Sequence, residues 1–352
     1  MFTLEMLPAY YGDSLWTTYG SNNSAFLIDG GLAGTYDSII ARAGTKTALE
    51  LFCITHIDQD HIQGAVKLLA NLPQTIDIAE VWFNGYDHLT PEQRLGAKQG
   101  EELTAAIVNH AKLPWNKLWN DKAVVVPPDG PLPVITLPGG MRVTLLSPRQ
   151  SELDRLKITW EKECQAAGIM PGDIDDAERV LAADRSTRLG DHINVRELAA
   201  QPYSADSAPA NGSSIAFLAE FKNTTVLYGA DAQSEVLAPA IRRLLKERGV
   251  SKLPLTACKV PHHGSKFNNS PDFIELLDCP RWLVSTSGKR FNHPDPETIA
   301  RILIAREGAQ TEFYFNYRSD RSEAWDNEEL AEEWNYEAHY PKKGNEGLTV
   351  VL

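Results

Sequence analysis

The side chains best suited to chemistry in this sequence lie in one short segment. His56, Asp58, Asp60 and His61 fall within six residues, directly after an apolar run typical of a buried strand and before a segment with helical spacing. Imidazole nitrogen and carboxylate oxygen are ligands of divalent metal ions. A helix N-cap needs only one aspartate, so two aspartates and two histidines favour a metal site over a cap. His56 and Asp58 could hold one ion, and the pair that follows them could hold a second.

We expect this segment to be a turn from a strand into a helix, within two groups of strands flanked by helices. The first group of strands is predicted at residues 2–7, 14–19, 25–28, 49–54 and 81–83. The second group is predicted at 141–146, 214–221, 225–228, 255–260 and 282–285, with helices at 236–248, 273–277 and 296–306. This grouping implies two sheets packed face to face, with helices outside them.

Other parts of the chain have weaker patterns. Two charged segments, 88–122 and 151–200, are expected to be largely helical. Residues 127–140 are rich in proline and glycine, and residues 201–211 are small and polar, so both are expected to be loops. The acidic tail at 320–337, which carries several tryptophans, is expected to be a solvated helix or an extension at a sheet edge.

The segment Thr-His-x-Asp-x-Asp-His resembles the signature of the metallo-β-lactamase-fold hydrolases. It is similar in particular to the branch typified by the hydrolase domain of the bacterial competence DNA-uptake channel, which has aspartate at the second ligand position, here Asp58. Further motifs of that branch are matched in order by Gly12-Asp13-Ser14, Leu27–Gly31, Asn211–Ser214, Tyr228–Asp231, Lys259–Ser265 and Asn292-His293-Pro294. Two of them depart from the family pattern: Ala230 is an extra residue before the aspartate, and the gap before His293 is shorter.

The resemblance implies an α/β fold, the four-layer αββα metallo-β-lactamase sandwich, as a single domain over residues 1–352. The matching motifs run from residue 12 to about 305. We expect two helical insertions at about 85–130 and 148–210 and a C-terminal extension at about 310–352. Nothing known of the family transfers to these three segments.

By the same resemblance, Asp231 would bridge both metal ions, and His293 would complete the second ion's site. Asp29 is expected to orient a ligand histidine rather than bind metal. Asp13 is expected to lie in a structural turn nearby. The remaining histidines are expected to be surface side chains rather than ligands, namely His88, His110, His192 and His339.

The third motif has Asn211 where many relatives have a ligand histidine, so the first ion is short of one ligand. One of the adjacent residues His262 and His263 could fill that gap, while the other acts as general acid on the leaving oxygen. We favour His263 as the ligand and His262 as the acid, with the reverse as the alternative, and count Asp60 with His262 as catalytic. The predicted metal ligands are therefore His56, Asp58, Asp60, His61, Asp231, His263 and His293.

These residues predict a metal-dependent hydrolase, in the first place a phosphodiesterase or nuclease that uses hydroxide bound to two divalent ions. Zinc and manganese are equally suited, because aspartate at the second ligand position makes the first site harder. A centre of this charge attracts a phosphoryl or carboxylate group even on an acidic protein. The side chains expected to bind substrate are Ser265, Lys266, Lys289 and Arg290.

Two other functions remain open. The first is a hydrolase of a small ester, lactone or thioester, which would not need the basic side chains. The second is a metal-stabilised effector of a bacterial defence or competence system, which binds a protein partner through the insertions. The sequence contains no GxSxG, GxxxxGK[ST] or GxGxxG motif, which argues against serine hydrolase, P-loop and dinucleotide-binding functions.

The composition narrows the classes of protein. The 352 residues include 34 basic and 47 acidic side chains, a net charge of −13, which argues against a broad basic face for nucleic acid and leaves local contacts to nucleic acid open. An apolar fraction of 43% is that of a globular protein. The four cysteines form no CxxC pair, so a zinc–thiolate site is not supported and a reducing compartment is favoured. We expect a cytoplasmic protein with no signal peptide and no membrane span.

Overall fold

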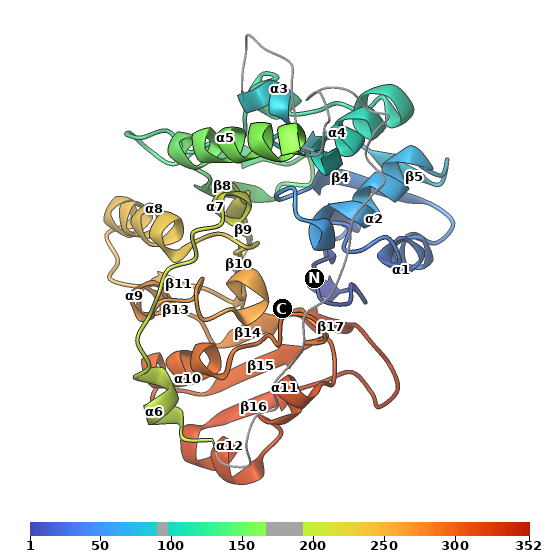
Figure 1. Cartoon of the computed structure of the whole chain (residues 1–352). Coiled ribbons are helices and arrows are strands. Elements are labelled where there is room, and N and C mark those ends of the chain that lie inside the picture. The colour runs from blue at the N-terminus through green and yellow to red at the C-terminus, as the bar shows by residue number, and fades with distance from the viewer. Residues whose placement is uncertain (90–97, 167–192) are drawn as a thin grey trace.

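The computed structural model of the chain describes residues 1–89, 98–166 and 193–352 (Figure 1). Parts of the predicted helical segments 88–122 and 151–200 lie outside these ranges, as does His192. The described part contains two large mixed sheets and a two-stranded ribbon made by β11 (Leu253–Pro254) and β13 (Leu277–Asp278).

The first sheet is built mainly from the N-terminal part of the chain. Within the described residues its order is β17–β1–β2–β3–β4–β5, with β6 paired to β4. Its strands are β1 (Phe2–Met6), β2 (Leu15–Tyr19), β3 (Ser24–Ile28), β4 (Thr47–Cys53), β5 (Ile76–Ile78), β6 (Val81–Trp82) and β17 (Leu348–Val351). Strands β17, β1, β2 and β3 pair antiparallel, whereas β4 pairs parallel with β3, β5 and β6.

The second sheet has the order β16–β15–β14–β12–β10–β9–β8–β7 within the described residues. Its strands are β7 (Val134–Thr136), β8 (Arg142–Ser147), β9 (Ala216–Phe221), β10 (Thr224–Tyr228), β12 (Ala257–Lys259), β14 (Arg281–Val284), β15 (Thr311–Phe315) and β16 (Tyr336–His339). Pairing is parallel from β16 to β10 and antiparallel from β10 to β7.

Parallel neighbours need a crossover connection, and helices supply most of them. The helices of the first half are α1 (Thr35–Ala43), α2 (Gln59–Ala70), α3 (Tyr86–Leu89), α4 (Lys98–Ala105), η1 (Ala106–Ala111), η2 (Lys117–Trp119) and α5 (Gln150–Ala166). Those of the second half are α6 (Val195–Ala199), α7 (Pro209–Gly212), α8 (Ser234–Arg248), η3 (Pro261–Gly264), α9 (Pro271–Glu275), α10 (Pro296–Ala305), α11 (Asp320–Glu323) and α12 (Glu328–Trp334). None of the helices in the described ranges is both long and apolar enough to cross a membrane.

Apolar side chains from the two sheets interlock between them. The ring of Phe26 on β3 lies 5.6 Å from that of Tyr228 on β10 and 6.3 Å from that of Phe217 on β9, measured between ring centroids. A separate apolar cluster packs the other face of the first sheet on its helices, with Phe52 of β4 and Leu68 of α2 among its members. Helices α8 and α10 contribute to the core of the second sheet. The predicted α/β class with two sheets and flanking helices is confirmed.

The C-terminal tail extends both sheets. The chain after residue 310 adds β15 and β16 to the edge of the second sheet, and β17 pairs with β1 of the first. Of the two expectations for residues 320–337, the edge extension accounts for β16, while α11 and α12 are short helices that precede it. The alternating burial of β15, which neither expectation included, is that of a half-buried strand.

The register of the parallel strands brings the chemical motifs to one edge. Ile28 at the end of β3 is opposite Cys53 at the end of β4, so Asp29 and the segment 55–61 leave the first sheet together. Tyr228 at the end of β10 is opposite Lys259 at the end of β12. The carboxyl ends of parallel strands are where α/β folds place ligand sites.

Candidate metal centre

The segment after β4 is the predicted turn into α2. Asp58 stands at the N-cap of α2 with its side chain 42% exposed, while His56, Asp60 and His61 are buried. In the described structure the Asp58 carboxylate accepts no capping hydrogen bond. Its Oδ2 instead lies 3.5 Å from Nε2 of His56. The acidic side chain is therefore turned toward the histidine and is not used as a helix cap.

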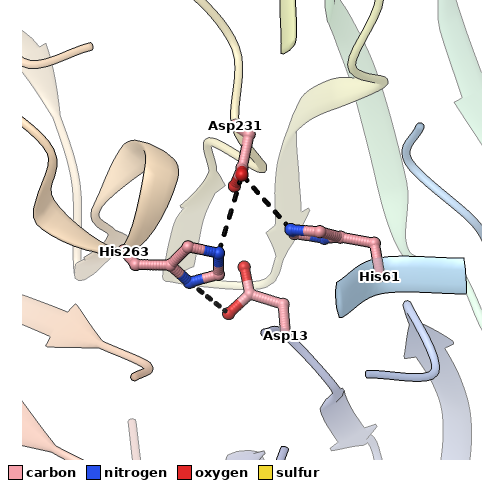
Figure 2. Close-up of side chains that lie close together, drawn as sticks. All are labelled: Asp13, His61, Asp231 and His263. Atoms are coloured by element: carbon pink, nitrogen blue, oxygen red, sulfur yellow. Dashed lines mark ion pairs between the residues drawn. The ribbon is translucent and has the colours of Figure 1, made fainter. Parts of the chain in front are cut away.

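Asp231 is the point on which the cluster converges. It follows β10, and its Oδ2 lies 3.2 Å from Nε2 of His61, 3.6 Å from Nε2 of His262 and of His263, and 3.9 Å from Nε2 of His56. Figure 2 shows His61 and His263 reaching Asp231 from two sides, with Asp13 beside His263. These four side chains each place one potential ligand atom within 4.8 Å of the others.

Hydrogen bonds at Nδ1 decide which nitrogen of each ring faces the cluster. Nδ1 of His263 lies 2.7 Å from the carbonyl oxygen of Ser285, which can only accept, so Nδ1 carries the proton. Nδ1 of His61 lies 2.8 Å from the Asp29 carboxylate and donates to it. In the neutral form of both rings Nε2 therefore carries the lone pair, and this atom lies 3.2 Å (His61) and 3.6 Å (His263) from Oδ2 of Asp231. This places Asp29 in the orienting role expected from the sequence.

His56 is held in the same way through a hydroxyl. Thr55 donates its hydroxyl proton to Asp29 over 2.8 Å, so its oxygen is left to accept from Nδ1 of His56 over 3.0 Å. Within the described residues, Nε2 of His56, Nε2 of His61, Nε2 of His263 and Oδ1 of Asp231 are buried with no hydrogen-bond partner. Buried polar atoms are almost always paired. Four buried ligand atoms without a partner in one cluster fit a divalent metal ion.

The backbone turns both adjacent histidines into the cluster. Neighbouring side chains on a strand point to opposite faces, but β12 ends at Lys259 and the two histidines lie in the turn η3. His262 has φ 46° and His263 has φ 54°, the left-handed region that costs about 1–3 kcal/mol for a residue other than glycine. Both rings face Asp231 as a result.

Of these two histidines, His263 is the one that lies beside Asp60 and His61. Nε2 of His263 is 3.6 Å from Oδ2 of Asp60, and its ring centroid is 5.3 Å from that of His61. The structure thus places His263, and not His293, beside Asp60 and His61. The sequence prediction instead assigns His263 to the first ion's site, with His56 and Asp58.

His262 is held by a polar network that the sequence did not indicate. Its Nδ1 lies 2.8 Å from Oδ1 of Asn268, whose amide donates to Oδ2 of Asp206 and to the carbonyl oxygen of Asp231. Asp206 also accepts from the amide of Asn211 over 2.7 Å. Asp206 lies in the segment 201–211, which we predicted to be an ordinary surface loop. A single aspartate among small polar residues has no pattern that would reveal this contact.

His293 lies on the outer side of His262. The ring centroids are 5.4 Å apart, and Nδ1 of His293 lies 3.5 Å from Oδ2 of Asp295. Burial lowers the pKa of His293, although Asp295 opposes this shift. The structure therefore brings His293 to the centre but next to His262, which differs from the expected place beside Asp60 and His61.

Charges inside the cluster shift one another's pKa values. Burial alone would raise the pKa of the Asp231 carboxyl, but the surrounding imidazoles hold it well below its ordinary range. Burial alone would lower the pKa of His61, yet the neighbouring carboxylates, led by Asp231, raise it well above its usual value. The same opposition raises the pKa of His263 to about 10. The carboxylates therefore favour positive charge here, which a divalent cation supplies as well as protons do.

Asp13 and Lys259 form a buried ion pair behind the cluster. Nζ of Lys259 lies 2.6 Å from Oδ2 of Asp13, and both side chains are fully buried. The other carboxylate oxygen of Asp13 is 3.5 Å from Nδ1 of His263. Asp13 is thus more than a turn residue, because it contacts a ring of the cluster. The lysine stands inside a matched motif, but its pairing with Asp13 had no signal in the sequence.

The four side chains expected to bind substrate have different surroundings. Ser265 is buried, and its hydroxyl accepts from the backbone of Phe267. Lys266 is engaged by Glu297 at 2.7 Å. Lys289 and Arg290 are exposed. Arg290 nevertheless donates a hydrogen bond to the Tyr11 hydroxyl over 2.8 Å, whereas Lys289 extends from an exposed position of the same loop.

The remaining histidines lie apart from the cluster where they are described. His110 is exposed. His88 is half-buried against the ring of Trp115, with centroids 4.3 Å apart. His339 lies 3.3 Å from Glu312 and stacks on Tyr314. His192 lies outside the described residues.

No protein-family model matches the sequence, and no curated protein matches it. The structure is similar to solved structures at low sequence identity. One is CmlA from Streptomyces venezuelae, described as a diiron β-hydroxylase, at 12% identity and a TM-score of 0.44, covering 100% of this chain and 54% of that one. A point mutant of CmlA gives 12% identity and a TM-score of 0.42, covering 99% and 54%. The chain thus spans about half the length of these two.

A third similar structure is YhfI from Bacillus subtilis, described as a metallo-β-lactamase fold protein. It matches at 11% identity and a TM-score of 0.39, covering 100% of each chain. The resemblance to the competence branch stays a prediction. Likenesses of this size say nothing about activity, so any assignment of function depends on the chain's own side chains.

Proposed function

We propose that the protein is a metal-dependent phosphodiesterase with a centre for two divalent ions around Asp231. The observation that carries this proposal is the set of buried Nε2 atoms of three histidines, His56, His61 and His263, which have no hydrogen-bond partner among the described residues. An imidazole whose Nδ1–H is held by an oxygen presents Nε2 as a metal ligand, and such orienting partners are typical of metal sites.

We assign the ligands to two ions, with His56 paired to Asp58 at 3.5 Å and His263 paired to Asp60 at 3.6 Å. His56, Asp58 and His262 would hold one ion, and Asp60, His61 and His263 would hold the other, with Asp231 shared. Imidazole and carboxylate ligands suit zinc and manganese alike. When bound, the ions would activate water and stabilise charge on the attacked centre.

The chain's own groups fix the geometry and handle protons. Asp29, Ser285 and Asn268 each hold one ring by its Nδ1, so the Nε2 atoms are aimed before any ion arrives. His293 lies outside the ligand set, with Asp295 at 3.5 Å. We assign to His293 the proton transfer at the leaving oxygen, because His262 is engaged by the cluster.

A phosphodiester fits the charge of this centre. Two dications carry four positive charges, and Asp58, Asp60 and Asp231 return three negative ones, so the centre attracts an anion. Lys289 and Arg290 add exposed positive charge on the loop that carries His293.

The test is cleavage by metal-stripped protein to which Mn²⁺, Mg²⁺ or Zn²⁺ is returned. Substrates are labelled single- and double-stranded DNA and RNA, simple phosphodiesters, and lactone and thioester controls, and the Asp231→Asn variant excludes a contaminating enzyme. We expect metal-dependent phosphodiester cleavage by the wild type alone, with about two ions per chain by elemental analysis. Turnover of lactones or thioesters without any phosphodiester cleavage would overturn the substrate assignment. Failure of the stripped protein to take up metal would overturn the centre itself.

A further inference from the structure

An exposed aromatic ring and the side chains that support it lie beside the candidate metal centre. Phe291 is 47% exposed on the loop that follows β14. Its ring centroid lies 5.6 Å from that of Tyr11, with the planes at 88°. The guanidinium of Arg290 lies 5.1 Å from the Phe291 ring and 5.2 Å from the Tyr11 ring, and it donates a hydrogen bond to the Tyr11 hydroxyl over 2.8 Å. We call Tyr11, Arg290 and Phe291 the aromatic platform.

The platform is fixed relative to the centre by short covalent and packed connections. Tyr11 is two residues before Asp13, and Phe291 is two residues before His293. The Phe291 ring stacks on His293 with centroids 6.2 Å apart and planes at 28°, and His293 in turn contacts His262. The two loops are also tied by a backbone hydrogen bond from Ser287 to Tyr10.

Single exposed apolar side chains are common and need no explanation by themselves. Phe291 differs because three neighbouring groups hold its ring in place while much of it stays open to solvent. Its loop also turns at Asn292, whose φ of 59° lies in the left-handed region that asparagine tolerates. An ordered, exposed ring with a guanidinium beside it is the arrangement on which planar groups stack in nucleic-acid and nucleotide recognition.

We infer that the aromatic platform binds a planar ring of the substrate, a nucleobase joined to the phosphodiester that is cleaved. This inference rests on the proposed function, because it assigns what flanks the reacting group at the same centre. It also fits the net charge of −13. Binding by neutralisation of many phosphates needs a broad basic surface, whereas stacking of one base next to a metal centre does not.

The experiment removes the base from the substrate and the aromatic ring from residue 291 independently, and compares the effects on KM. Substrates are a dinucleotide phosphodiester, its two single-abasic forms and its doubly abasic form. Proteins are the wild type, Phe291→Ala, and Phe291→Trp, which keeps a ring. We expect Phe291→Ala to raise KM about tenfold for the dinucleotide, the size typical of one base–aromatic stack, with kcat and metal content little changed. Phe291→Trp should restore KM, and the doubly abasic substrate should show no difference between variants.

Binding provides a readout that does not depend on turnover. The Kd of the dinucleotide for Asp231→Asn should also rise about tenfold when Phe291→Ala is added. A bis-aryl phosphodiester is the comparison substrate, because its planar rings are not nucleobases. If Phe291→Ala weakens its binding as much as that of the dinucleotide, the platform accepts any planar ring, and the nucleobase assignment is overturned. An unchanged KM and Kd for the dinucleotide in Phe291→Ala would overturn the platform while leaving a phosphodiesterase intact. If the wild type cleaves no phosphodiester, the proposed function fails, and the Kd alone decides on the platform.

Discussion

Nε2 of His263 lies 3.6 Å from Oδ2 of Asp60, although the two residues are carried by different sheets of the sandwich. Asp60 lies in the first turn of α2, after a strand of the first sheet, and His263 follows β12 of the second. The centre is therefore complete only when the carboxyl ends of β4 and β12, one from each sheet, lie next to each other. Asp231, which follows β10 of the second sheet, links this pair to the rest of the cluster.

The division of ligands predicts different metal contents for three histidine variants. His262→Ala and His263→Ala should each reduce the metal content from about two ions per chain to about one, because we assign one of these rings to each ion. His293→Ala should keep both ions and lose turnover, since we place it outside the ligand set. Elemental analysis with turnover on the same preparations checks this. Loss of metal from His293→Ala, with both ions kept in His262→Ala, would restore the assignment expected from the sequence.

Asp29 should control metal affinity without being a ligand. Its carboxylate accepts from Nδ1 of His61 and from both the backbone and the hydroxyl of Thr55. Removal of such an orienting partner typically weakens metal binding about 10–100-fold. We expect Asp29→Ala to show a weakening of that order in competition with a chelator. The exposed residue Asp278 gives a matched control, Asp278→Ala, which should bind metal as the wild type does. An Asp29→Ala variant with wild-type affinity would show that Asp29 does not orient His61.

The sequence predicts the local parts of this site better than their mutual placement. The strand, turn and helix around His56 and His61 follow from an apolar run and helical spacing, and both are local properties. The strand β15 could also have been predicted from the sequence. Its segment Thr-Glu-Phe-Tyr-Phe is rich in residues that favour strands, and its buried and half-buried positions alternate. The inclusion of Asp231 came from a family resemblance rather than from spacing.

The roles of His262, His263 and His293 could not be predicted in the same way. They depend on positive φ angles at two adjacent histidines, and histidine indicates that backbone region far more weakly than glycine does. The contacts of Asp206 and of Lys259 are between residues far apart in the sequence. A buried lysine also runs against the usual preference of that side chain for the surface.

Asp206 and Asn268 should act on the first ion through His262. Asn268 accepts from Nδ1 of His262 and donates to Asp206, so Asn268→Ala removes the group that fixes the ring's tautomer. We expect Asn268→Ala to lose the first ion at chelator concentrations that leave the second in place, and Asp206→Ala to show the same change more weakly. Asp272→Ala, which removes an exposed aspartate paired with Arg242, is the control and should keep both ions. Equal metal content in Asn268→Ala and the wild type would contradict this role.

The buried pair of Lys259 and Asp13 predicts a large loss of stability when only one partner is removed. Breaking a buried ion pair leaves a charge without its partner and costs about 3–5 kcal/mol. Lys259→Met in the metal-free protein should therefore unfold at a clearly lower denaturant concentration than the wild type. Adding Asp13→Asn should recover part of the loss, because the uncompensated carboxylate is then gone. Arg242→Met, which breaks an exposed ion pair, should cost only about 0–1 kcal/mol. A Lys259→Met variant as stable as Arg242→Met would mean that water reaches the Asp13 carboxylate and that this pair does not support the centre from behind.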